Sequence, residues 1–278
     1  MPAPVKQHRV GKPDGGQRRT YGTKPIKSAA IPYSMHDSIY GKALLALAAF
    51  IPAIIYVVWI RNTERYQREP WGAIFAAFIW GATIAVGISI VLELLFGPLG
   101  RGFPLGASLW AAVVLAPFVE EFAKPLGVTY VRKAIREPED GLVYGAICGL
   151  GFAATENLIY IWSAASAGSV ASLVFTILVR SVASMLLHAS ATAITGYGIS
   201  LMILGKKEPL SVLPFYLAAV LIHGAFNFIV SVPIFGLFGS LASLALAIAF
   251  SLGTIRYVRT KIMKLDAREF WQEVVWWK

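Results

Sequence analysis

The chain has 278 residues, of which 57% are hydrophobic and only 14% are charged, and its net charge is +10. Soluble domains hold about 25% charged residues, so this composition and a mean hydropathy of +0.65 exclude an ordinary soluble domain. A single cysteine, Cys148, excludes a disulfide framework and a cysteine-rich zinc site. The basic residues lie in tails and in loops between apolar stretches, which is typical of membrane proteins. We find no nucleotide-binding fingerprint, and we expect a lipid bilayer rather than nucleic acid as the partner.

The two ends of the chain differ in composition from its middle. Residues 1–38 are basic, rich in glycine and proline, and lack the apolar core of a signal peptide. We therefore predict a disordered N-terminal tail over 1–38. Residues 39–255 form a membrane-embedded helical domain in this prediction. Residues 256–278 form an amphipathic tail that lies on the membrane surface.

The middle of the chain predicts an all-α, polytopic membrane protein with about seven to eight transmembrane helices and a polar active site inside the bundle. A span needs about 20 apolar residues. The stretch 169–204 is too long for one ordinary crossing, so we divide it into a short helix at 169–180 and a span. In the fourth span, Gly145 and Gly149 have the spacing that lets two helices approach closely. The predicted spans are 40–60, 71–96, 107–131, 141–162, 181–204, 211–230 and 234–254.

The loops indicate an orientation. The loops 61–70, 132–140 and 205–210 and the C-terminal tail would share one face, and they carry most lysine and arginine residues outside the N-terminal tail. The loops of the opposite face carry only Arg101. Positive loops stay in the cytoplasm, so the first face is predicted to be cytoplasmic. The basic N-terminal tail disagrees, because the alternation of spans would place it outside.

The third span carries the most unusual polar group of the chain. Glu120 and Glu121 lie near the middle of an apolar stretch, and Lys124 follows one turn later. A charged side chain at the bilayer centre costs about 2.5–3.5 kcal/mol on insertion scales. Packing does not require such residues, so we expect them to perform chemistry or to carry ions. Lys124 can also act simply as the charge partner of either glutamate.

Three further ionisable side chains lie at one predicted depth. Glu156, His188 and His223 are each six or seven residues from a span end on the same face, roughly 10 Å deep at the helical rise. Two imidazoles and a carboxylate match a zinc shell with an open position, beside which Glu120 could take a proton from bound water. Each residue also has a plainer interpretation. A membrane histidine can be an interhelical hydrogen-bond donor, and Arg180 can simply pair with Glu156. Proton-coupled transporters use similar residues, so polarity alone leaves both a protease and a transporter open.

Four motifs in chain order resemble the PrsW family of intramembrane proteases, which is related to the CAAX prenyl endopeptidases. Lys124 and Glu156 distinguish this chain from the CAAX enzymes, whose corresponding motifs resemble EExxxR and FxxxH. The resemblance covers about 110–230. Its motifs are EExxK at Glu120–Lys124, FxxxE at Phe152–Glu156, the segment from Arg180 to His188, and HxxxN at His223–Asn227.

The resemblance implies a multi-pass protein of the cell membrane that cuts membrane-anchored protein substrates, as in the first cleavage of an anti-sigma factor. It implies Glu120 as the general base, Glu121 as a ligand or orienting partner, and Asn227 as a donor to the oxyanion. Zn²⁺ would be held by Glu156, His188 and His223, with Lys124 and Arg180 in support. A mechanism without a tightly held metal, using Glu120 and His223, stays open. So does a non-catalytic scaffold of the same superfamily. The sequence carries no information on oligomeric state.

Overall fold

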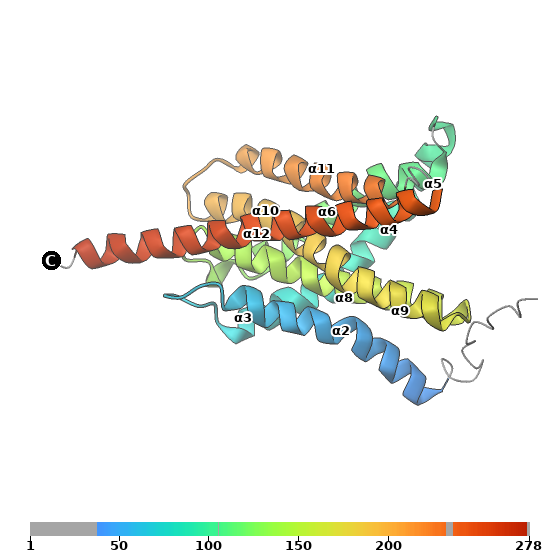
Figure 1. The fold of residues 1–278 in the computed structure, drawn as a ribbon. Coiled ribbons are helices and arrows are strands. Elements are labelled where there is room, and N and C mark those ends of the chain that lie inside the picture. Colours follow the sequence, from blue (N-terminus) through green and yellow to red (C-terminus); the bar gives the residue numbers. More distant parts are fainter. Residues whose placement is uncertain (1–37, 105, 232–235, 277–278) are drawn as a thin grey trace, which may run out of the picture.

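In the computed structural model, residues 38–104, 106–231 and 236–276 are described, without the side chains of 236–240 and 269–276. The predicted tail over 1–38 therefore lies almost wholly outside the described residues. Helices joined by short turns and loops make up the described part, and they run roughly side by side as one bundle (Figure 1). The predicted all-α class is confirmed.

The helices follow the predicted spans closely. Three of the predicted spans contain one turn or more of π-helix, labelled η1, η3 and η5. The third span is broken at Lys124 and Pro125, between α6 and α7. The elements are α2 (Ile39–Arg61), α3 (Trp71–Ile79), η1 (Trp80–Ala85), α4 (Val86–Phe96), η2 (Gly97–Gly102), α5 (Ala107–Trp110), η3 (Ala111–Leu115), α6 (Ala116–Ala123), α7 (Leu126–Tyr130), η4 (Arg132–Ala134), α8 (Asp140–Ser166), α9 (Val170–Val179), η5 (Arg180–Ser184), α10 (Met185–Ile203), η6 (Pro209–Ser211), α11 (Val212–Ser231) and α12 (Gly236–Trp276).

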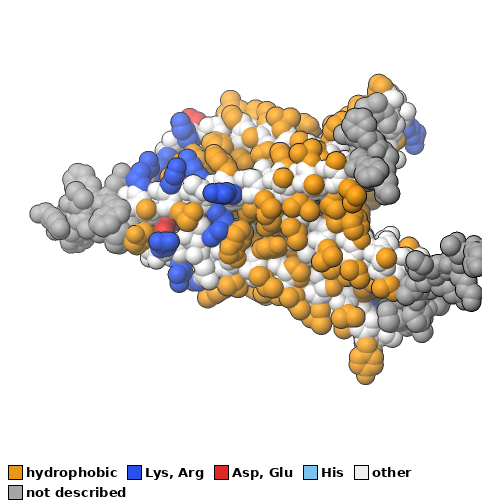
Figure 2. Space-filling view, viewed as in Figure 1, with side chains coloured by type: hydrophobic (Ala, Val, Ile, Leu, Met, Phe, Trp, Pro, Cys, Tyr) orange, Lys and Arg blue, Asp and Glu red, His pale blue; other side chains and the backbone are white. Residues whose placement is uncertain are grey.

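Six helices in the described ranges are long and apolar enough to cross a membrane. The broken segment α5–α7 is not among them, and with it the number is roughly consistent with the predicted count of about seven to eight. On the face drawn in Figure 2, apolar side chains cover the middle of the molecule. The chain is a multi-pass membrane protein, as predicted.

Two predicted boundaries differ from the structure. The separate short helix at 169–180 is wrong, because α9, η5 and α10 form one continuous helix of 34 residues, Val170–Ile203. The π turn of η5 inserts a residue into this helix at the position where we had placed the break. The proposed C-terminal tail is also continuous with the last span, since α12 runs without interruption across Arg256. Its position on the membrane surface stays a prediction.

The helix α8 lies at the centre of the bundle and packs most extensively on α10 (Figure 1). A Cβ atom at Gly145 would lie 2.7 Å from the carbonyl oxygen of Thr192, and one at Gly149 would lie 2.3 Å from that of His188. These distances are shorter than any side chain tolerates, so the two helices meet through glycine. The predicted close approach at this pair is confirmed. It brings the polar residues of α8 against those of α10.

The loops 61–70, 132–140 and 205–210 and the C-terminal half of α12 lie at one end of the bundle, which we call the basic end (Figure 1). The backbone N–H of Arg65 donates to Asp266 of α12 at 2.8 Å, and Ser200 donates to the carbonyl of Pro138 at 2.7 Å. Figure 2 shows lysine and arginine side chains gathered there. The shared face that we predicted for these loops is therefore present. Its assignment to the cytoplasm stays a prediction.

Candidate functional site

The helix α6 presents Glu120, Glu121 and Lys124 to the interior of the bundle. Their spacing of three and four residues puts all three side chains on one side of the helix. The Lys124 ammonium donates to Glu121 Oε1 at 2.6 Å and to Glu120 Oε2 at 3.2 Å. It is completely buried, and both carboxylates are buried with it. Lys124 is thus the charge partner of both glutamates.

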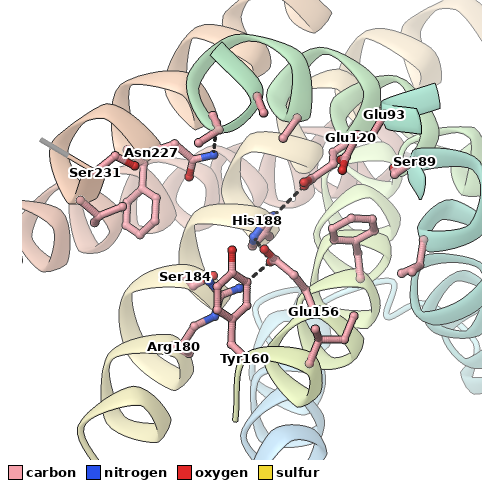
Figure 3. Close-up of a pocket in the computed structure, with 18 of the residues that line it drawn as sticks. Ser89, Glu93, Glu120, Glu156, Tyr160, Arg180, Ser184, His188, Asn227 and Ser231 are labelled. Atoms are coloured by element: carbon pink, nitrogen blue, oxygen red, sulfur yellow. Dashed lines mark hydrogen bonds and ion pairs between the residues drawn. The ribbon is translucent and has the colours of Figure 1, made fainter. Parts of the chain in front are cut away.

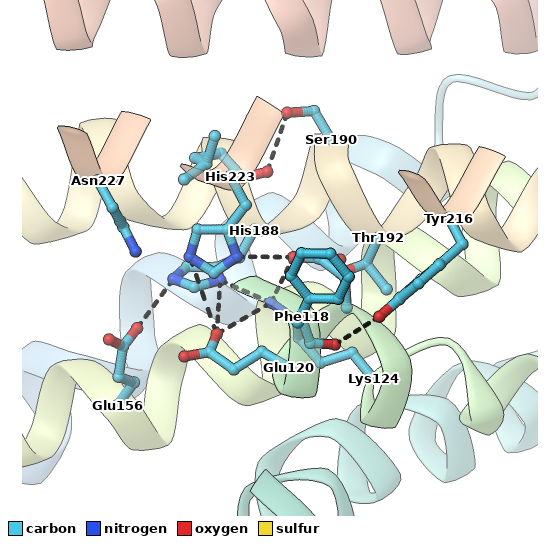
Figure 4. Close-up of polar contacts among 12 residues, drawn as sticks. Phe118, Glu120, Lys124, Glu156, His188, Ser190, Thr192, Tyr216, His223 and Asn227 are labelled. Carbon is cyan, nitrogen blue, oxygen red and sulfur yellow. Dashed lines mark hydrogen bonds and ion pairs between the residues drawn. The ribbon is translucent and has the colours of Figure 1, made fainter. Parts of the chain in front are cut away.

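Two imidazoles complete this cluster, as Figure 4 shows. The Nδ1–H of His223, on α11, donates to Glu121 Oε1 at 2.9 Å. On α10, Nδ1 of His188 lies 3.0 Å from the Lys124 ammonium, from which it accepts, since an ammonium can only donate. These partners fix the tautomers, because one ring nitrogen of each histidine is left to face Glu120 or Glu156. The two rings pack edge to face with centroids 4.8 Å apart.

Glu156 lies on the other side of His188, on α8. Its Oε2 is 2.8 Å from His188 Nε2 and 2.6 Å from the Arg180 guanidinium. Arg180 also donates to Asn157 at 2.7 Å and stacks over the Tyr160 ring at 3.9 Å. The pairing of Arg180 with Glu156, which was the plainer interpretation of that arginine, is present. The structure brings Glu156, His188 and His223 into one layer, as the depth argument expected.

Asn227 lies one turn beyond His223, on the same side of α11. Its Nδ2 donates to the carbonyl of Ala112 at 2.7 Å. Ala112 belongs to η3, and a π turn leaves carbonyl groups without their usual helical partner. Asn227 therefore fastens α11 to the irregular part of the third span. One amide hydrogen remains beyond the one that Ala112 receives.

A cavity of about 600 Å³ opens beside this cluster, at the end of the bundle opposite the basic end. Figure 3 shows that Glu120, Glu156, Arg180, His188 and Asn227 point into it. Glu121, Lys124 and His223 do not line it, so they lie behind the residues that do. The two adjacent glutamates therefore have different surroundings: Glu120 meets the cavity, and Glu121 is enclosed by its partners. The sequence motif alone could not separate them in this way.

The donor atoms suit a zinc ion. Glu120, His188 and His223 each offer one ligand atom, and these atoms lie within 4.8 Å of one another. Imidazole nitrogens and carboxylate oxygens are common zinc ligands. A carboxylate stands behind each imidazole, Glu156 behind His188 and Glu121 behind His223, as is usual around metal-binding histidines. Lys124 opposes an ion, because its ammonium already contacts two of the three donor groups.

The set of converging donors differs in one member from the ligands that the resemblance implies. In that set Glu120 replaces Glu156, whose nearer oxygen is engaged by Arg180 and by His188. The roles of the site residues are therefore taken up below as a proposal.

Comparison with known proteins decides the family. Residues 69–253 match the family model described as PrsW family intramembrane metalloprotease. That match covers well over half of the chain and includes every site residue named above.

The chain belongs to the PrsW family.

Its relatives include the protein named Protease PrsW of Clostridioides difficile (strain 630), which is 32% identical over 195 residues, 68% of this chain and 79% of the relative. The Protease PrsW of Shouchella clausii (strain KSM-K16) is 28% identical over 193 residues, 67% of this chain and 83% of the relative. That of Geobacillus kaustophilus (strain HTA426) is 26% identical over 153 residues, covering 55% and 64%. No solved structure matches. The PrsW match begins at Glu69 and ends at Gly253, so it extends beyond the segment 110–230 that the motifs had indicated.

Proposed function

We propose that this chain is an intramembrane endopeptidase that hydrolyses peptide bonds of membrane-anchored proteins at the cavity beside Glu120. One observation carries the proposal. Of two adjacent buried carboxylates, only Glu120 reaches the cavity, whereas Glu121 is enclosed by Lys124, His223 and Thr192. The substrate class implied by the PrsW resemblance is an anti-sigma-factor-like protein, cut at its first site.

In the proposed mechanism, Glu120 is the general base. Its carboxylate takes a proton from a water molecule in the cavity, and the water oxygen attacks the carbonyl carbon of the scissile peptide bond. The protonated Glu120 then delivers that proton to the leaving nitrogen as the carbon–nitrogen bond breaks. Lys124 supplies a fixed positive charge 3.2 Å from Glu120, which stabilises the negative charge of the site. The remaining amide hydrogen of Asn227 is directed to the oxyanion.

We further propose that His188 and His223 hold a zinc ion, with either Glu156 or Glu120 as the carboxylate ligand. When bound, zinc would lower the pKa of a coordinated water and polarise the substrate carbonyl. The donor set and the carboxylates behind both imidazoles support this proposal. The alternative without metal uses Glu120 and His223, whose Nε2 lies 3.9 Å from Glu120 Oε2.

The test is cleavage of membrane-anchored test substrates by the purified protein, comparing the wild type with Glu120→Gln. Loss of a general base reduces the rate by about 10²- to 10⁴-fold. Glu208→Gln is the matched control. It removes the same charge as Glu120→Gln, but Glu208 is exposed at the basic end. Equal cleavage by wild type and Glu120→Gln would remove Glu120 from the mechanism. No cleavage by the wild type across several substrates would favour the scaffold.

Metal content of the same samples separates the ligand sets. If Glu156 is the ligand and Glu120 the base, Glu120→Gln keeps its zinc and Glu156→Gln loses it. If Glu120 is the ligand, the result is reversed. A fully active wild type that contains no metal, and that chelators do not inhibit, would leave the mechanism with Glu120 and His223 alone. The transporter alternative has no support from the family match.

A further inference from the structure

A second group of buried carboxylates lies at the basic end, far from the cavity. Glu64 and Glu69 belong to the loop between α2 and α3, and Asp140 begins α8. Each offers one oxygen, and these oxygens lie within 4.8 Å of one another. Their exposed fractions are 1%, 0% and 3%. Asp140 is sixteen positions before Glu156 on α8, so the group is about 24 Å from the proposed active site at 1.5 Å per residue.

In each carboxylate of this group, one oxygen accepts hydrogen bonds that orient the side chain. Glu64 Oε2 accepts from the backbone N–H of Glu69 at 3.2 Å, and Glu69 Oε2 accepts from the Tyr144 hydroxyl. Asp140 Oδ2 accepts from the backbone N–H groups of Arg136 and Glu137 at 2.6 and 3.0 Å. The group is therefore held in place by donors outside it. This leaves one further oxygen on each side chain.

The further oxygen of Glu69 lacks a donor. Glu69 Oε1 is fully buried and has no hydrogen-bond partner in the described part of the chain. In the same ranges, no ion pair joins a lysine or arginine to any of the three carboxylates. The arginines of the loop turn elsewhere: Arg61 donates to the backbone carbonyl of Glu69 at 2.7 Å, and Arg68 to that of Glu64 at 3.0 Å. A group of buried carboxylates with one unsatisfied oxygen and no ion-pair partner lacks the positive charge that would stabilise it.

Carboxylate oxygens without nitrogen or sulfur donors are the ligands that Mg²⁺ and Ca²⁺ prefer. We propose that Glu64, Glu69 and Asp140 bind one such hard divalent cation. The cation takes the place of the missing positive charge and ties the loop between α2 and α3 to the start of α8. This all-carboxylate site differs from the site at Glu120, where imidazoles and an ammonium accompany the carboxylates.

The test is calorimetric titration of the purified full-length chain in detergent with CaCl₂ and, separately, with MgCl₂, at one pH and after removal of metals. We expect one saturable site per chain for at least one of the two salts. Glu69→Gln and Asp140→Asn keep the shape of each side chain and remove one charge, and they should weaken binding by at least about tenfold. Glu64→Gln provides an independent variant if either of these fails to fold by circular dichroism.

Two control variants test whether the cation binds at Glu64, Glu69 and Asp140 and not elsewhere in the chain. Glu208→Gln removes an exposed carboxylate of the same end and should bind like the wild type. Glu120→Gln removes the carboxylate of the other cluster and should also bind like the wild type, whatever its proteolytic activity. The proposal is overturned if neither salt binds the wild type. It is overturned equally if the variants of the basic end bind normally, or if Glu120→Gln alone abolishes binding.

Discussion

Most carboxylates beside the cavity and all three of the basic end are buried, but the two groups differ in which donors or cations neutralise them. Glu120 and Glu121 share Lys124, and Glu156 has Arg180. Glu64, Glu69 and Asp140 have only neutral donors among the described residues, namely backbone N–H groups and a tyrosine hydroxyl. A charge within an apolar span is costly, and there the chain itself supplies the counter-charge. Near an aqueous end, the solution can supply it.

We expect the largest loss of folding free energy where the counter-charge belongs to the chain itself. Lys124→Met leaves two buried carboxylates without their cation, and breaking a buried ion pair in this way costs about 3–5 kcal/mol of folding free energy. Unfolding in mixed micelles, followed by tryptophan fluorescence, measures it. The double variant Lys124→Met with Glu121→Gln should recover part of the loss, because one of the stranded charges is then absent. A Lys124→Met protein as stable as the wild type would contradict the comparison.

We expect a smaller change in folding free energy where a cation from the solution supplies the counter-charge. A cation at about 100 times its dissociation constant stabilises the folded state by about 2.7 kcal/mol. We therefore expect the unfolding midpoint of the wild type to rise with the cation that binds, and that of Glu69→Gln to rise less at the same cation concentration. Lys124→Met should respond to the cation like the wild type, because its defect lies at the other cluster. If the cation raised the unfolding midpoint of Glu69→Gln but not that of Lys124→Met, the cation would bind at the cluster beside the cavity, which contradicts the comparison.

The two clusters also differ in the backbone packing beside them, and substitutions that test this packing have the smallest expected effect on stability. A Cβ at Gly149 meets the carbonyl of His188 at 2.3 Å, and Gly149→Ala should cost about 1–3 kcal/mol and displace that histidine. Gly72, near Glu69, has no atom within 4 Å of its Cβ position, so Gly72→Ala should be neutral or stabilise by about 0.4–1 kcal/mol. Cleavage assays should show a large loss for Gly149→Ala and none for Gly72→Ala. Equal activities would mean that this contact does not position His188.

The cavity cluster could be predicted largely from the sequence, and the basic-end cluster could not. Charged residues are so costly in an apolar span that Glu120, Glu156 and His188 each attract attention, and span ends supply their depths. Glu64 and Glu69 lie in a loop where charge is ordinary, so nothing in their local pattern signals burial. Only the fold, which brings the start of α8 against that loop, creates the second group.

The irregular helix geometry also escaped prediction. A π turn requires one extra residue and leaves no mark in the apolar pattern. The long stretch 169–204 was therefore divided at the position where η5 continues the helix. The change of composition at Arg256 similarly predicts a boundary. The helix α12 is continuous across that position and extends to Trp276 in the described part of the chain. Composition marks where a helix leaves the bilayer, and it does not mark where a helix ends.

The length of α12 has a mechanical consequence. Its 41 residues span about 60 Å at the rise of an α-helix, roughly twice the thickness of the hydrocarbon layer. Asp266, in the C-terminal half of this helix, accepts hydrogen bonds from the backbone N–H groups of Arg65 and Tyr66. A displacement of this half of α12 would therefore act directly on the loop that holds Glu64 and Glu69.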